Sequence, residues 1–223
     1  MKKIRLVIGT MLMILMLAVS GASADTIVAG EVIQLYDSYG DSPGGAFSVY
    51  KNGVYQFETF CLEYNEYFYY GEPLTVAGVT KQAVSGGVGG SVNGADPLDS
   101  RTAYLYYNYR INQLSSIASG FLYSNSASAT ALQQAIWYIE QETTAPLSGL
   151  ALTLYNAANS ALTSNPSAVL TAYNNVAVLN LKHQNGTNSQ DQLTMTSVPE
   201  PATMLLLGLG LIGLAGVRSR LKK

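Results

Sequence analysis

The chain has 223 residues, 48% of them hydrophobic and 12% charged, and a formal net charge of −2 at pH 7. Between residues 25 and 198 it carries five basic side chains against thirteen acidic ones, which argues against nucleic acid and anionic lipid as partners because both require a basic surface. That segment is long enough for one domain with its own hydrophobic core.

Residues 1–24 have the three parts of a secretory signal peptide. Basic side chains lie within the first five residues, an apolar run extends from Leu6 to Val19, and Ala22-Ser23-Ala24 supplies the small residues that signal peptidase requires. We therefore expect cleavage after Ala24 and export of the rest. The alternative is an N-terminal membrane anchor, for which the apolar run is short.

The first part of the exported segment predicts antiparallel strands. Residues 44–64 contain two runs rich in Val, Phe and Tyr on either side of Asn52-Gly53. Asn-Gly is a strong hairpin signal because both residues tolerate a positive φ angle. Cys61 is then near the far end of the second hairpin strand. Alternation places Cys61 on the same face as Phe57 and Thr59, but which face meets the core stays open.

The rest of the segment predicts helices followed by more strands, with helical apolar spacing most regular at 126–143. The predicted fold is therefore α+β: a single domain at 25–198 with an antiparallel sheet and a few packed helices. The expected elements are a strand at 26–38, a Gly-rich loop at 84–97, helices at 96–114, 126–143 and 149–165, strand character at 167–184 around Asn174-Asn175, and a last strand at 192–198.

The sequence lacks the residue groupings that most enzyme active sites and metal sites require. His183 is the sole histidine and stands in a polar, turn-like stretch, so a catalytic triad could be built only around it. No His/Cys cluster suggests zinc and no Asp-rich loop suggests calcium. We expect no metal, no cofactor and no enzymatic turnover, and a secreted hydrolase is the least favoured alternative.

The C-terminal segment has three parts in a fixed order. Pro199-Glu200-Pro201 comes first, an uncharged apolar helix at 202–217 follows, and Arg218 and Arg220 begin a basic end. The helix is slightly short for a bilayer core, and the basic end should stay cytoplasmic. In this arrangement, residues 199–223 closely resemble the PEP-CTERM sorting signal of Gram-negative bacteria.

That resemblance implies a destination and a processing partner. An exosortase would recognise the tail while the 202–217 helix anchors the protein transiently in the inner membrane, and would cut near Pro199-Glu200-Pro201. The body would then reach the cell surface or the extracellular matrix. A sorting signal carries no information about the activity of the body.

Cys61 is the sole cysteine, so it cannot form a disulfide within the chain. A stray thiol is a liability in an oxidising compartment. Three interpretations remain open: the thiol is buried and inert, it pairs with another chain, or its sulfur is bonded in some other way.

Two short motifs favour the third interpretation. Leu132 to Trp137 reads Leu-Gln-Gln-Ala-Ile-Trp, and Cys61 lies within Phe60-Cys61-Leu62. These segments resemble the glutamine and cysteine motifs of the Cys–Gln thioester domains of bacterial surface adhesins, in the same order along the chain. The resemblance implies that Cys61 and Gln133 are joined as a thioester, with Phe60, Leu62 and Trp137 as supporting residues.

A thioester implies adhesion by covalent attachment. An amine or hydroxyl on a surface or matrix polymer would take the acyl group and free the thiol, so the protein would react once. The alternative is a non-covalent matrix or carbohydrate-binding protein that uses its tyrosines, which cluster at 63–72 and 104–110 and offer rigid amphipathic area.

Overall fold

The computed structural model of the chain describes residues 26–41, 44–84 and 87–196. The predicted signal peptide at 1–24, the predicted membrane helix at 202–217 and the sorting residues Pro199, Glu200, Pro201, Arg218 and Arg220 lie outside the described residues. Within the described part of the chain, no helix is both long and apolar enough to span a membrane.

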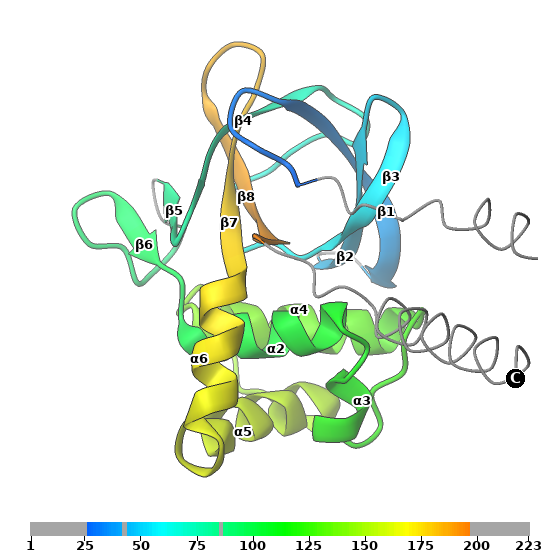
Figure 1. Ribbon diagram of the computed structural model, residues 1–223, viewed down its shortest axis with the longest axis vertical. Coiled ribbons are helices and arrows are strands. Elements are labelled where there is room, and N and C mark those ends of the chain that lie inside the picture. The colour runs from blue at the N-terminus through cyan, green and yellow to red at the C-terminus, as the bar shows by residue number, and fades with distance from the viewer. Residues whose placement is uncertain (1–25, 42–43, 85–86, 197–223) are drawn as a thin grey trace, which may run out of the picture.

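An antiparallel sheet and a layer of helices make up the fold, which confirms the predicted α+β class (Figure 1). Six strands follow one another across the main sheet in the order β3-β2-β1-β4-β7-β8, and β5 and β6 form a separate small pair. The strands are β1 Val32–Asp41, β2 Gly44–Lys51, β3 Val54–Thr59, β4 Leu74–Thr80, β5 Gln82–Val84, β6 Ala95–Pro97, β7 Val176–Lys182 and β8 Asn188–Met195.

The hairpin predicted at Asn52-Gly53 is confirmed. β2 and β3 pair in antiparallel fashion across this two-residue turn, and both turn residues have positive φ angles, 52° for Asn52 and 75° for Gly53. Such a turn matches the right-handed twist of the flanking strands. The hairpin carries the chain into the segment that holds Cys61.

The residues after β3 join the two ends of the sheet. Leu193 N donates to Phe60 O at 3.0 Å, and Leu62 N donates to Asp191 O at 3.1 Å. Between these two bonds, Cys61 lies opposite Gln192 as an antiparallel bridge. The first and last strands of the six-stranded order therefore meet at a seam, and Cys61 lies in it.

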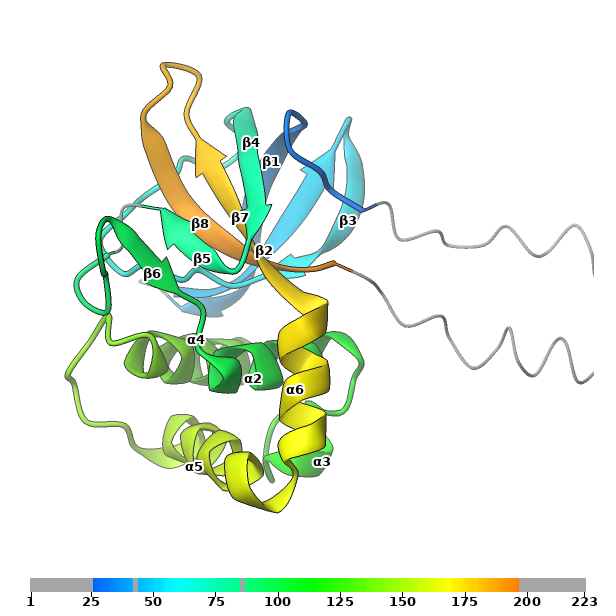
Figure 2. The ribbon, with the colours of Figure 1, turned by 60° about the vertical axis from the view of Figure 1, so that its left-hand side comes forward.

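The helices lie beneath the sheet, with α2 and α4 next to it and α5 farther away (Figure 2). α4 packs against β1 and β2, and the apolar positions of its predicted stripe are buried. This confirms the helix predicted there, which begins after the N-cap Asn125. The helices are α2 Ser100–Arg110, α3 Leu114–Ile117, α4 Ser126–Ile139, α5 Gly149–Ser164 and α6 Pro166–Asn175.

The strand character expected over 167–184 is wrong for its first half. Residues up to Asn175 form α6, and β7 starts directly at Val176. The side chain of Asn165 accepts a hydrogen bond from Ala168 N, and Pro166 occupies the first turn. This pair is a favoured helix start, because proline has no N–H to leave unsatisfied there.

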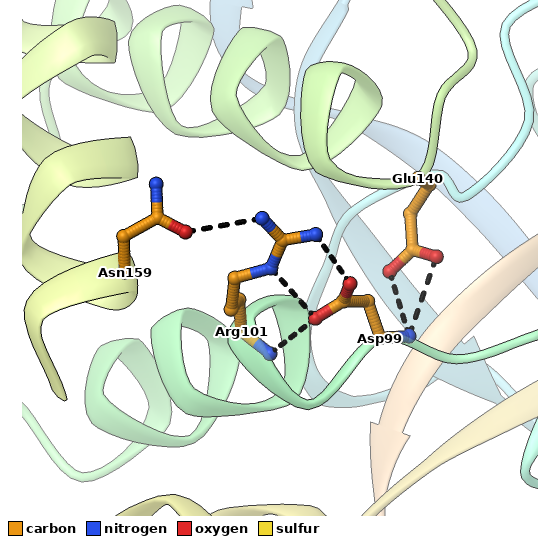
Figure 3. Close-up of polar contacts among 4 residues, drawn as sticks. All are labelled: Asp99, Arg101, Glu140 and Asn159. Atoms are coloured by element: carbon orange, nitrogen blue, oxygen red, sulfur yellow. Dashed lines mark hydrogen bonds and ion pairs between the residues drawn. The ribbon is translucent and has the colours of Figure 1, made fainter. Parts of the chain in front are cut away.

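A polar cluster ties α2 to the neighbouring helices (Figure 3). Asp99 caps α2 by accepting from Arg101 N, and the guanidinium of Arg101 bonds both the Asp99 carboxylate and Asn159 Oδ1 on α5. The carboxylate of Glu140, at the end of α4, accepts from Asp99 N at 3.2 Å. The helix layer is therefore held together by charge-assisted hydrogen bonds as well as by its core.

Candidate functional site

The site begins with the backbone of Cys61. In an antiparallel bridge of this kind the two flanking residues make the hydrogen bonds across the seam, so the N–H and C=O of Cys61 point away from β8. Cys61 is 1% exposed, so these backbone groups need other partners.

The amide of Gln133 supplies both partners. Cys61 N donates to Gln133 Oε1 at 2.9 Å, and Gln133 Nε2 donates to Cys61 O at 2.8 Å. Gln133 is 0% exposed. The structure thus brings together the two residues predicted from the sequence, which lie 72 positions apart. The side-chain carbonyl of Gln133 also lies against an N–H donor belonging to the cysteine itself.

A close approach between β2 and α4 makes this pairing possible. A Cβ atom at Gly44 would lie 2.8 Å from Gln133 Cγ and 2.4 Å from the ring of Trp137. Neither distance is tolerated without movement, so only glycine lets the strand lie this close to the helix. Gly44 therefore sets the depth at which Gln133 reaches the seam.

The Cys61 sulfur contacts two other glutamines, both on β8. Sγ lies 2.9 Å from Gln190 Oε1, which can accept the thiol proton, and Gln192 Nε2 donates to Sγ at 3.3 Å. Burial raises the pKa of Cys61 well above its ordinary value, although the Gln192 hydrogen bond acts in the opposite direction. The sulfur is therefore a protonated thiol held between two side-chain amides, while the amide of Gln133 bonds the backbone of the same residue.

Neither of these two glutamines is predicted as a site residue from the sequence. Gln190 and Gln192 stand two apart on β8, so they share one face of the strand. A pair of amides on one face of a buried strand was the available signal. What the sequence could not show is that this face meets Cys61.

Buried carboxyls lie beside the amides. Asp191 N donates to Glu63 Oε2 at 2.8 Å, and Glu63 Oε1 is buried with no partner among the described residues. Burial, followed by the neighbouring Asp191, raises the pKa of Glu63 well above its usual range. Burial also raises the pKa of Asp191 to about 7. The raised pKa favours the neutral form of Glu63, which carries no negative charge beside the sulfur.

The three supporting residues predicted from sequence fall in two places. Trp137 packs with Cys61 and Phe47 in one small buried cluster, and its indole N–H donates to Glu63 O at 3.2 Å. Phe60 and Leu62 belong instead to the larger core shared with the helices. This split follows from strand alternation, since the neighbours of Cys61 point to the opposite side.

An aromatic pocket of about 360 Å³ lies beside the residues that surround Cys61. Phe47, Phe68 and Trp137 pack around Cys61 and also line this pocket, as does Gln190, whose oxygen contacts Sγ. The remaining lining residues are four tyrosines of the β3–β4 connection: Tyr64, Tyr67, Tyr69 and Tyr70.

Other candidate sites predicted or dismissed from sequence can be placed as well. His183 Nδ1 lies 3.1 Å from Glu72 Oε2, and both side chains are partly buried. In the described part of the chain, no group of three or more His, Cys, Asp or Glu side chains is arranged to hold a metal ion.

Comparison with known proteins identifies the tail. Residues 197–220 match the PEP-CTERM protein-sorting motif. The match supports the predicted sorting signal and implies an exosortase as processing partner, export, and a transient membrane anchor. No curated protein and no solved structure matches the chain.

Proposed function

We propose that this exported, exosortase-sorted protein attaches covalently to a cell-surface or matrix target through a thioester between Cys61 and Gln133. The observation that carries the proposal is the double hydrogen bond between the Gln133 amide and the backbone of Cys61. Any buried glutamine amide needs hydrogen-bond partners. Here both partners belong to Cys61, the sole cysteine of the chain.

Thioester formation would proceed within this arrangement. Cys61 Sγ attacks Gln133 Cδ, and the negative charge that develops on Oε1 is stabilised by the N–H of Cys61, which already donates to that oxygen. The C–N bond then breaks, the thiol proton passes to Nε2, and ammonia leaves. Before the attack, Gln190 Oε1 accepts a hydrogen bond from the Cys61 thiol. As the thiol loses its proton, the hydrogen bond from Gln192 Nε2 stabilises negative charge on the sulfur.

The opposite half-reaction would join the protein to its target. A primary amine attacks the thioester carbonyl carbon, the C–S bond breaks, and a proton from the amine returns to the sulfur. The high pKa of the buried thiol favours this last transfer. The product is a stable amide, so each molecule reacts once and does not turn over. Burial protects the thioester from water until then.

The proposal is tested by linkage to an amine-bearing probe. The full chain, purified in detergent, is incubated with a biotinylated primary amine, denatured, and examined for biotin that survives denaturation. We expect labelling of the wild type and of Gln134→Ala, which alters an exposed neighbour on the same helix. Cys61→Ala and Gln133→Ala should abolish labelling. Equal labelling of all four proteins would contradict the proposal.

A further inference from the structure

The aromatic pocket adjoins the Cys61 sulfur, because Gln190 both lines the pocket and contacts Sγ. Its floor is formed by rings that touch the cysteine, among them Phe47 and Trp137. Burial, with Asp37 and Cys61 nearby, raises the pKa of Tyr70 on its wall. Because Cys61 itself is buried, an incoming amine would reach the thioester through this pocket.

The walls are unusual in being aromatic and uncharged. Apart from Gln190, every lining residue is a Phe, Tyr or Trp. Tyr67 is 73% exposed and Tyr69 is 77% exposed. Tyrosine is an amphipathic ring, with an apolar face and a hydroxyl, and an aromatic face also attracts a cationic amine. The surrounding domain is rich in acidic side chains, which favours a positively charged partner.

The volume of the pocket limits which molecules can fill it. About 360 Å³ lies at the lower end of the range of small-molecule sites, roughly 300–1,000 Å³. A small alkyl amine would leave most of this space unfilled. A lysine side chain would offer the rings a thin stem, whereas a sugar ring offers a broad C–H face together with hydroxyls. The amphipathic rings suit the sugar better.

We propose that the pocket lined by Tyr67, Tyr69 and Trp137 binds an amino-sugar residue of a glycan and presents its primary amine to the Cys61–Gln133 thioester. This inference rests on the proposed thioester. The amine nitrogen attacks Gln133 Cδ and the C–S bond breaks. One amine proton goes to the Cys61 sulfur, so the sugar becomes an amide of residue 133. No oxidant, reductant or further reactant is required.

The test compares rates of thioester opening in the full chain, purified in detergent. Glucosamine, Nα-acetyl-lysine amide and methylamine are each added to wild type and to the double variant Tyr67→Ala/Tyr69→Ala, and adduct formation is followed by mass. The ratio of the glucosamine rate to the methylamine rate should fall about tenfold or more in the variant. Differences in intrinsic amine reactivity cancel in this comparison. The ratio of the Nα-acetyl-lysine amide rate to the methylamine rate should change little.

Controls separate the possible failures. Tyr55→Ala removes a tyrosine that is 50% exposed and does not line this pocket, and it should leave both ratios unchanged. An unchanged glucosamine ratio in the double variant would overturn the inference while methylamine opening still supports the thioester. The inference would also be overturned if the ratio of the lysine-derivative rate to the methylamine rate fell more than the ratio of the glucosamine rate to the methylamine rate. If methylamine opens nothing in the wild type, the proposed function fails and this inference fails with it.

Discussion

Gln192 shows how a single side chain can adjust the pKa of the Cys61 thiol. Its amide donates to Cys61 Sγ, while its own Oε1 is buried with no partner among the described residues. A buried oxygen without a hydrogen-bond partner lowers the free energy of unfolding. This atom of Gln192 therefore does not stabilise the fold. Its hydrogen bond to sulfur lowers the pKa of Cys61 against the larger effect of burial.

Replacing this residue should slow the reaction without weakening the fold. Gln192→Leu removes the donor to sulfur and also removes the unsatisfied oxygen, so we expect unchanged or slightly higher thermal stability. A hydrogen bond to a charged group is worth roughly 1.5–3 kcal/mol, so thioester formation should be slower by about tenfold or more. The fraction of molecules lacking ammonia, followed over time after synthesis, measures this. A wild-type rate in the variant would show that Gln192 does not assist the thiol.

At the scale of elements, the close contact between β2 and α4 sets the position of the Gln133 amide against Cys61. Gly44→Ala places a methyl group against Gln133 and the Trp137 ring, so the helix must shift and the Gln133 amide should lose its register with Cys61. We expect a clear loss of amine labelling in a protein that still folds. Gly53→Ala is the matched control, since a Cβ there meets open space and only the turn is strained. Equal labelling of the two variants would mean that the close approach is not required.

Local sequence signals predicted several of these elements. The Asn52-Gly53 turn and the apolar stripe of α4 are features of a few adjacent residues, and both are present in the structure. α6 was missed although Asn165-Pro166 marks its start, because the apolar run of β7 follows without a break and dominates the pattern.

The seam at Cys61 is a different kind of feature. It depends on pairing residue 61 with residue 192, and no local pattern encodes a pairing over that distance. The Cys61–Gln133 contact was reached only through resemblance to a family motif. The two glutamines of β8 could not be placed at the sulfur because their position depends on closure of the whole sheet.

At the scale of the whole molecule, buried acids make folding sensitive to pH. Burial raises the pKa of Glu140 to about 8, and the pKa values of Asp191 and Glu63 are raised as well. In the unfolded chain these carboxyls ionise near pH 4. Between about pH 4 and pH 8 the folded state therefore binds more protons than the unfolded state, and the free energy of unfolding falls as pH rises.

The melting temperature should accordingly be higher at pH 5 than at pH 8. Glu140→Gln removes one titrating group while its amide oxygen can still accept from Asp99 N, so the variant should show a smaller drop across this window. Asp41→Asn, at an exposed carboxylate, should leave the drop unchanged. A melting temperature that rises from pH 5 to pH 8 would contradict the assignment of neutral buried carboxyls.

The central claim is that Gln133 has consumed the thiol of Cys61, and intact-mass spectrometry of freshly purified full chain tests it most directly. We expect the wild type to be lighter than its sequence mass by one ammonia. Gln133→Ala should instead have the full mass calculated from its own sequence. Methylamine should add once to the wild type and expose one free thiol. A full sequence mass with a thiol that titrates from the outset would contradict the claim.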